Sequence, residues 1–366
     1  MSVTSLGIKE GSASELRALL QRMPKIDLHR HLEGSLRVQT LVEIAAEHGV
    51  DLPAWDIETL RRYVQVREDE PDYHRFLAKF RLLRRFYRSR EAVERLAFEV
   101  VADAAADNIR YLELRFNPVA LSRSQGFPLA DVVEWVCGAV ERAQQALSIM
   151  VRLILQIGRD EFPRVAEEIL ALALAYRSRG IVGLDLAGDE VNYPAHRLAH
   201  LFRRARQEGL GVTIHAGEVG GASNVRDALL LFHAQRIGHG IHAIENSEVV
   251  RMLRERRVTL EVCPTSNLQT GAVHSLSHHP LPDILALGLR ATLNTDDPSI
   301  SDTTLTDEYL VAITAMGLSL EQIRQMIFYA VDAAFLPEAE REALRGQFAA
   351  WEHVSYPNCV EEVCPV

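Results

Sequence analysis

The chain has 366 residues, of which 48% are hydrophobic and 25% are charged, and its formal net charge is −10. Such a composition is typical of a globular protein with a large core. The negative charge disfavours duplex nucleic acid or an anionic membrane as a partner, since both attract basic surfaces. No apolar run is long enough to span a bilayer, and the first residues lack the basic and apolar segments of a signal peptide. We therefore expect a cytoplasmic protein.

The four cysteines are Cys137, Cys263, Cys359 and Cys364. Their spacing lacks the close pairs of a structural zinc site, and a chain of this size does not need disulfide bonds to hold its core. We expect all four to be reduced thiols.

The first elements are a helix, a short strand and a long helical region. Ser14 to Arg22 has a helical pattern, and after Pro24 the segment Lys25 to His29 is typical of a strand. Residues 36–107 are predicted to form a helical insertion after this strand, with Ser35 capping its first helix. Further along the insertion, Phe76 and Phe80 lie on one face of a strongly amphipathic helix.

From Tyr111 onward, strand-like runs and helical segments alternate regularly, which indicates a parallel sheet in an α/β fold. Counted with the first strand there are eight such units, and eight units predict a closed (β/α)8 barrel of the TIM type. An open doubly wound sheet would need a glycine-rich phosphate turn after the first strand, and His-Arg-His-Leu-Glu-Gly is not one. Extra C-terminal helices are predicted over 305–352, and the whole of 1–366 is predicted to be one domain. The later strands are expected at 111–116, 151–157, 181–186, 212–215, 236–239, 259–263 and 290–294.

Metal-ligand residue types stand where several of these strands end. In a barrel of this kind the carboxyl ends of the strands meet at one mouth. His29 and His31 leave the same face of the first strand, while His215 and Asp296 follow two later strands. Alone, a His-x-His pair or an Asp-Asp pair before a proline would be unremarkable. Together, three imidazoles and a carboxylate suit a catalytic Zn²⁺ with one position open for water, so we predict one zinc ion per chain.

Other polar residues at the same strand ends could do the remaining chemistry. Zinc lowers the pKa of bound water and supplies hydroxide, and a second group must deliver a proton, for which Glu218 is the candidate. His239 could orient or deprotonate the water, although a histidine there could equally be a core residue. Asp297 is free to accept a hydrogen bond from a substrate, and Asp185 and Ser266 could orient the ligands.

These residues lie in segments that resemble the ordered signature of the adenosine deaminase family, which belongs to the amidohydrolase superfamily of barrels. The resemblance runs from about Pro24 to Pro298, and Cys-Pro-Thr-Ser-Asn at 263–267 and the lid-like Phe-Leu-Ala-Lys-Phe at 76–80 are similar as well. The segments that carry it are His-Arg-His-Leu-Glu-Gly-Ser (29–35), Asp-Leu-Ala-Gly-Asp-Glu (185–190), His-Ala-Gly-Glu (215–218), Arg-Ile-Gly-His-Gly (236–240) and Leu-Asn-Thr-Asp-Asp-Pro (293–298).

The resemblance implies hydrolytic deamination at C6 of a purine through a single zinc, with release of ammonia. By matching position, Glu218 would protonate ring N1 and His239 would position the hydroxide. The metal ligands it implies are His29, His31, His215 and Asp296. The substrate contacts it implies are Asp297 with N7, the backbone of Gly188 with N3, and His31, Phe76 and Phe80 around the purine.

One position departs from the pattern, because typical members have aspartate where this chain has Glu33, and that residue helps to hold the ribose 5′-hydroxyl. Relatives with glutamate there include enzymes that act on free adenine, and aminofutalosine is a further candidate substrate. The segment 185–190 looks more like that of the nucleoside enzymes, so we favour adenosine and 2′-deoxyadenosine. Three alternatives stay open: another 6-aminopurine, phosphoester or lactone hydrolysis on a similar barrel, and a catalytically dead barrel that acts as a binding protein.

The remaining histidines receive no role. His274, His278 and His279 precede Pro280, and we expect them in a solvated loop. The sequence carries no signal for an oligomeric state.

Overall fold

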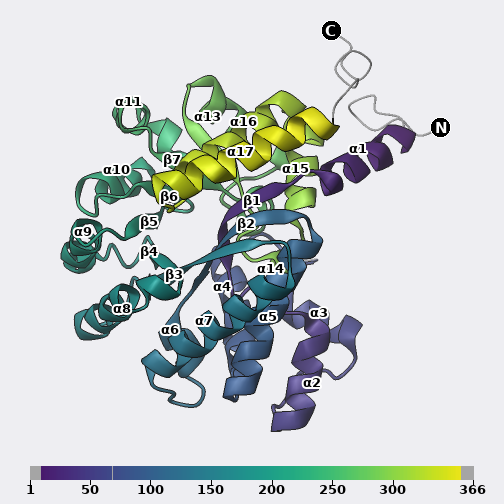
Figure 1. Ribbon diagram of the computed structural model, residues 1–366, viewed down its shortest axis with the longest axis vertical. Coiled ribbons are helices and arrows are strands. Elements are labelled where there is room, and N and C mark those ends of the chain that lie inside the picture. Colours follow the sequence, from purple (N-terminus) through teal and green to yellow (C-terminus); the bar gives the residue numbers. More distant parts are fainter. Residues whose placement is uncertain (1–9, 68, 356–366) are drawn as a thin grey trace.

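Among residues 10–67 and 69–355, which this computed structural model describes, eight parallel strands pair in chain order and helices surround them (Figure 1). The strand residues are almost all buried, as expected for strands that are covered on both faces. The strands are β1 Lys25–His31, β2 Ile109–Phe116, β3 Met150–Gly158, β4 Ile181–Ala187, β5 Gly211–Ala216, β6 Arg236–His239, β7 Thr259–Val262 and β8 Arg290–Leu293.

The last strand meets the first through the residues that follow it. Arg30 and Asp296 form an isolated parallel bridge, in which the Asp296 N–H donates to the His29 carbonyl and the His31 N–H donates to the Asp296 carbonyl, each at 2.8 Å. The barrel is therefore nearly closed, and its seam lies between three of the predicted metal ligands. The predicted (β/α)8 fold is confirmed.

Helices follow each strand, with a helical insertion after β1 and four helices after the last strand in the described residues. No helix in the described residues is long and apolar enough to cross a membrane. The helix before β1 is α1 Glu10–Arg22, and the insertion holds α2 Val38–His48, α3 Ile57–Val64, α4 Tyr73–Leu83 and α5 Arg90–Ala106. Next come α6 Pro118–Ser122, α7 Leu129–Ala146, α8 Pro163–Ala175, α9 Ala199–Gln207, α10 Ala222–Leu230 and α11 Ser247–Arg256. The last are α12 Pro264–Gln269, α13 Leu281–Ala286, α14 Pro298–Ser301, α15 Leu305–Thr314, α16 Leu320–Ala333 and α17 Glu338–Ser355.

Two local predictions are wrong. Ser35 does not cap α2, which begins at Val38 after a residue with no side-chain cap, because the Ser35 hydroxyl donates to the His31 carbonyl at 2.5 Å and holds the chain at the strand end. His279 is buried rather than solvated, because its ring accepts from the Leu281 N–H at 3.1 Å and reaches Asn267. Of the cysteines, Cys137 and Cys263 are buried free thiols, and the other two lie outside the described residues.

The interior of the barrel is charged. Glu113 and Arg115 on β2, Asp185 on β4, Arg236 on β6 and Glu261 on β7 are all buried. Arg115 contacts Asp185 at 3.2 Å and Glu261 at 2.9 Å, while Arg236 contacts Glu113 at 2.5 Å and Glu261 at 2.6 Å. Two guanidinium groups thus compensate three carboxylates inside the sheet, where an unpaired charge would be costly.

The floor of the barrel, at the amino ends of the strands, is closed by the segment between α16 and α17. The Phe335 N–H donates to Glu113 at 2.6 Å, and Arg236 donates to the Ala333 carbonyl at 2.9 Å. The Arg236 guanidinium also lies 3.6 Å from the centre of the Phe335 ring. A Cβ atom at Gly211 would lie 2.3 Å from that ring, so the close approach of Phe335 requires glycine there. The floor segment is therefore bonded directly to the interior charges.

Replacement of Arg236 by alanine should lower the free energy of unfolding by about 3–5 kcal/mol, because it leaves Glu113 and Glu261 buried with too few partners. Urea unfolding followed by circular dichroism measures the change. The exposed Arg226→Ala is the control and should change stability by less than about 0.5 kcal/mol. Equal stability of the two variants would contradict the structural role of the interior charges.

Candidate active site

Four of the predicted ligand atoms converge at the carboxyl ends of β1, β5 and β8. His31 Nε2 lies 3.3 Å from His29 Nε2 and 3.2 Å from His215 Nε2. Asp296 Oδ1 lies 3.2 Å from the Nε2 atoms of both His29 and His31. All four side chains are buried. Four ligands placed about 2.0 Å from one ion in a tetrahedral arrangement would lie about 3.3 Å apart, so this spacing fits a metal site.

Each of the three histidines has its other ring nitrogen next to an acceptor. His29 Nδ1 donates to Glu261 at 2.7 Å, His215 Nδ1 to Asp185 at 3.0 Å, and His31 Nδ1 to the Gln156 carbonyl oxygen at 3.1 Å. These contacts place the proton of each neutral ring on Nδ1 and leave the Nε2 lone pair aimed at the cluster.

The electrostatics favour a cation at this point. Burial lowers the pKa of His215 to about 4, which keeps the ring neutral and able to bind a metal. Three lone pairs and a carboxylate oxygen cannot satisfy one another by hydrogen bonds, because none of the four carries a proton to donate. His239 also reaches the group, since donor atoms of His29, His215, His239 and Asp296 lie within 4.8 Å of one another.

The loop after β5 carries Glu218 to the same place and is held there by Glu190. The Glu190 carboxylate accepts from the backbone N–H groups of Gly217, Glu218, Val219 and Gly220 at 2.8–2.9 Å. Because four peptide groups point at one buried carboxylate, this loop has little freedom to move. Glu218 is thereby fixed with Oε2 3.6 Å from His239 Nε2.

The surroundings of Glu218 and His239 shift the pKa values of the two residues in opposite directions. Burial, with the nearby carboxylates of Asp296 and Glu190, raises the pKa of Glu218 well above its usual value and favours the protonated acid. Burial lowers the pKa of His239 and favours the neutral ring. His239 Nδ1 lies 3.1 Å from the Asn267 amide nitrogen, which donates to it, so the His239 proton is placed on Nε2, facing Glu218.

A cavity of about 480 Å³ opens over this cluster and contains every predicted substrate contact. Its size is within the range of small-molecule sites. Asp297 Oδ1 and Glu33 Oε2 are buried without a hydrogen-bond partner among the described residues, so each can take a polar atom of a ligand. Phe76 and Phe80 on α4 form one wall, with ring centres 6.4 Å apart. Asp185 and Ser266 lie behind the cavity, and Ser266 donates to Asp296 at 2.7 Å.

Two side chains of the cluster stand on strained backbone. His239 and Asp296 both have φ of +59°, in the left-handed region that residues with a Cβ rarely adopt. Gly188 has φ of +108°, which only glycine adopts readily, and it brings backbone directly to the cavity. Strain of this kind is typical of functional sites.

Several residues that shape the cluster were not predicted from the sequence. Glu261, Gln156, Glu190 and Asn267 each bond to a member of the cluster or to its loop. A signal existed for Glu261, because a lone carboxylate inside the apolar run Thr-Leu-Glu-Val indicates an inward-facing partner. The alternation of Leu-Glu-Leu-Arg-Phe on β2 was a similar signal for the interior charges.

Comparison with known proteins agrees with this geometry. Residues 24–351 match the family model described as Adenosine deaminase. The chain belongs to the adenosine deaminase family. It is thus a hydrolase that acts on carbon–nitrogen bonds in cyclic amidines. Adenosine deaminase of Shigella flexneri is 40% identical over 328 residues, which cover 90% of this chain and 98% of that protein. Adenosine deaminase of Klebsiella pneumoniae is 41% identical over 322 residues, covering 88% and 96%.

Several solved structures have the same fold. Adenine deaminase from Arthrobacter aurescens superposes with a TM-score of 0.83 at 30% identity, over 90% of this chain and 99% of that one. N6-mAMP deaminase from Arabidopsis gives 0.80 at 30% identity, over 91% and 99%. An amidohydrolase from Burkholderia ambifaria with bound Zn gives 0.85 at 27% identity, over 96% of each chain. Deaminases named for different substrates therefore share this barrel.

Replacement of Glu190 by glutamine should lower kcat by about 10- to 100-fold without loss of bound metal, because the amide turns N–H groups toward backbone donors and frees the loop that carries Glu218. Deamination rates and metal content of the purified variant measure this. Glu208→Gln, at an exposed position, is the matched control and should behave as the unmodified chain. Unchanged kcat in Glu190→Gln would show that the loop does not depend on this carboxylate.

Proposed function

We propose that this member of the adenosine deaminase family is a zinc-dependent enzyme that converts adenosine and 2′-deoxyadenosine to inosine and 2′-deoxyinosine with release of ammonia. The observation that carries the proposal is the convergence of three Nε2 atoms and one carboxylate oxygen, joined by four contacts of 3.2–3.3 Å, beside a buried acid. The 40% identity to adenosine deaminase over 98% of that relative's length supports the nucleoside substrate.

The metal would be held by His29, His31, His215 and Asp296. The donor set of three imidazoles and a carboxylate suits Zn²⁺ better than Mg²⁺ or Ca²⁺, which prefer oxygen ligands. When bound, zinc acts as a Lewis acid that activates water for attack at neutral pH.

Proton donation and the orientation of water fall to two residues of this chain. Glu218, whose raised pKa favours the protonated form, would donate to purine N1 as charge develops on the ring. His239, 3.6 Å away, carries its proton on Nε2 and would orient the attacking water by donating a hydrogen bond to it. Its neighbour Asn267 would keep the His239 ring in one orientation.

The purine would be held by groups that line the cavity. Purine N7 is an acceptor, so a hydrogen bond from Asp297 requires a protonated carboxyl. Burial and the neighbouring Asp296 raise the pKa of Asp297, which favours that form. The backbone of Gly188 would meet N3. Phe76 and Phe80 would cover the base as an apolar lid, and the free oxygen of Glu33 would accept from a hydroxyl at the sugar end.

A second candidate is a 6-aminopurine derivative with an anionic group at the sugar end, such as aminofutalosine or a nucleotide. The observation that favours it is that Arg81, Arg84 and Arg123 line the same cavity as Glu33. Structures of the Arabidopsis relative are complexed with IMP and with GMP.

Free adenine is a third candidate substrate, since one structural relative is an adenine deaminase. A catalytically dead barrel is disfavoured, because each proposed ligand and the proposed acid are present.

The test is a side-by-side assay of ammonia release from adenosine, 2′-deoxyadenosine, adenine, aminofutalosine and AMP, with metal quantified on the same sample. Turnover of the two nucleosides with about one zinc per chain would support the proposal. Turnover confined to another substrate would keep the reaction and replace the substrate. Absence of turnover on all five by a zinc-loaded protein would refute it.

Glu218→Gln should lower kcat by about 10²- to 10⁴-fold with zinc retained, because it removes the proton donor and leaves the ligands in place. His215→Ala should instead lose zinc and activity together, because it removes a ligand. Elemental analysis and steady-state kinetics of the two variants separate the roles. Near-normal turnover in Glu218→Gln, or stoichiometric zinc in His215→Ala, would overturn the respective assignment.

The cytoplasmic location expected from the sequence stays a prediction.

A further inference from the structure

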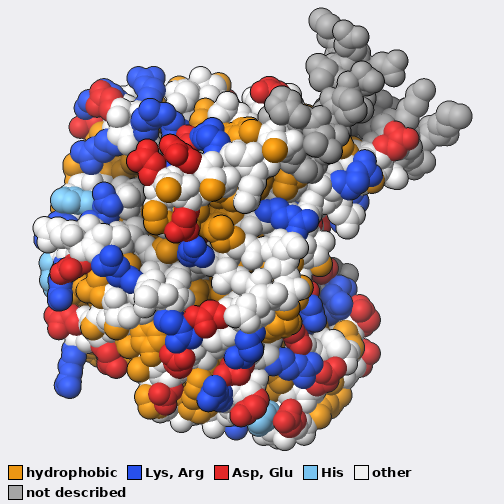
Figure 2. Space-filling model, viewed as in Figure 1, with side chains coloured by type: hydrophobic (Ala, Val, Ile, Leu, Met, Phe, Trp, Pro, Cys, Tyr) orange, Lys and Arg blue, Asp and Glu red, His pale blue; other side chains and the backbone are white. Residues whose placement is uncertain are grey.

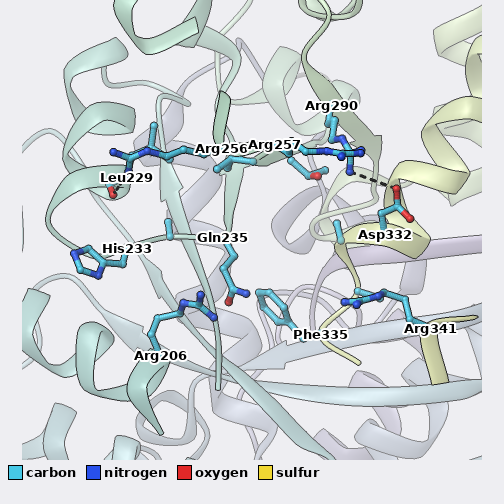
Figure 3. Close-up of a pocket in the computed structure, with 15 residues that line it drawn as sticks. Arg206, Leu229, His233, Gln235, Arg256, Arg257, Arg290, Asp332, Phe335 and Arg341 are labelled. Carbon is cyan, nitrogen blue, oxygen red and sulfur yellow. Dashed lines mark hydrogen bonds and ion pairs between the residues drawn. The ribbon is translucent and has the colours of Figure 1, made fainter. Parts of the chain in front are cut away.

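A second cavity lies on the side of the barrel opposite the proposed active site. Its volume is about 560 Å³, and it is lined by the ends of α9, α10 and α11, the first residues of β7 and β8, and the floor segment before α17 (Figure 3). Because the proposed active site occupies the carboxyl ends of the strands, the sheet and its interior charges separate the two cavities. This second cavity is referred to below as the floor cavity.

The charge of the floor cavity is opposite to that of the chain. Its lining includes five arginines and a single acidic residue, Asp332, although the chain as a whole carries −10. Figure 2 shows basic and acidic side chains side by side on the outer surface, including the upper left where α10 and α11 lie. The arginines are Arg206, Arg256, Arg257, Arg290 and Arg341.

Two of the five have partners in the fold. Arg256 donates to the Leu229 carbonyl at 3.0 Å, near the end of α10. Arg290 contacts Asp332 at 3.3 Å, and Asp332 also pairs with Arg345 outside the cavity. The one carboxylate is therefore already shared between two guanidinium groups. It leaves little negative charge for the other arginines of the cavity.

The guanidinium groups of Arg206, Arg257 and Arg341 have neither a hydrogen bond nor an ion pair with any residue of the described ranges 10–67 and 69–355. Partial burial lowers the pKa of Arg206, and no carboxylate offsets this effect. In Figure 3, Arg206 and Arg341 reach toward Phe335 from opposite sides of the cavity. Three unpaired cations thus border one concave space.

Helix electrostatics account for only part of this arrangement. Arg206 lies in the last turn of α9, where a cation interacts favourably with the helix dipole. Arg341 lies in the first turns of α17, where the same dipole is unfavourable to a cation. Arg257 has φ of +54° just after α11, a position that favours glycine. Arginine is therefore present at these two positions despite the local preference of the backbone.

We propose that the floor cavity is a binding site for a compact polyvalent oxyanion of the phosphate type, held by Arg206, Arg257 and Arg341. The planar guanidinium fork matches phosphate oxygens with paired hydrogen bonds, and the cavity is large enough for a small phosphate-bearing metabolite. The partly buried Phe335 ring supplies an apolar wall. This site is independent of the proposed function, because none of its residues lines the cavity over the metal cluster.

Two sources of the same chemistry are open to test, an inorganic polyphosphate and the phosphate chain of a nucleotide. Isothermal titration calorimetry of the full-length protein at low ionic strength, with inorganic triphosphate and with ATP as probes, compares them. We expect saturable binding of at least one probe that weakens as salt is added. Triphosphate bound as tightly as ATP would identify the phosphates as the recognised group. Tighter binding of ATP would add the base or sugar to the ligand.

The deciding comparison is between two double variants. Arg206→Ala with Arg341→Ala should weaken probe binding by about tenfold or more for each guanidinium removed. Arg164→Ala with Arg226→Ala removes the same charge from exposed positions outside the cavity and should leave binding within about twofold of the unmodified chain, because surface charge alone contributes little. Equal binding in the two double variants would overturn the proposal, as would the absence of saturable binding to the unmodified protein.

A third variant guards against loss of folding. Arg257→Gly removes a guanidinium, so it should weaken probe binding about tenfold. Because glycine adopts a positive φ without steric strain, the same variant should keep or raise thermal stability. Titration with the probe measures the first effect, and differential scanning calorimetry without the probe measures the second. A stable Arg257→Gly protein with unchanged affinity would remove Arg257 from the site.

Discussion

Two arginines and three carboxylates buried inside the barrel determine how the rest of the structure is arranged. Arg115 and Arg236 come from β2 and β6, and their partners come from β2, β4 and β7. Each of these buried charges would destabilise the fold if its partners were absent. The pairing therefore links strands that are far apart in sequence, and it couples the barrel floor to the mouth, since Glu261 contacts both Arg236 and His29.

The same network prepares the metal cluster. Glu261 and Asp185 each accept a hydrogen bond from the interior Arg115 and another from a histidine of the cluster. The carboxylates are thus held ionised by arginine, and they in turn hold the histidine tautomer that can bind a metal. A deaminase needs its ligands, acid and base in a fixed relation, and here that relation is set by groups that lie beneath the cavity.

The sequence was sufficient for the strands and for the predicted members of the cluster, and insufficient for the groups behind them. Apolar runs separated by helical periods identify barrel strands, and His29, His31 and His215 stand where such runs end, so one rule places them together. Ser35 and His279 were mispredicted because their partners, the His31 carbonyl and Asn267, are defined only by tertiary contacts. The role of Glu190 depends on four backbone N–H groups converging on it, and no residue pattern records the direction of a peptide group.

The left-handed backbone of His239 and Asp296 affects how the protein loses activity on heating. Each such conformation costs about 1–2 kcal/mol and persists only because the surrounding structure enforces it. His239 ends β6 and Asp296 lies just after β8, so a loosening of these strand ends, including the seam between Asp296 and β1, would let both return to ordinary angles. Their side chains would then swing away from the cluster while the barrel remained folded. Activity would be lost at a lower temperature than the one at which the barrel unfolds. The difference between these two temperatures would measure the local stability of the barrel mouth.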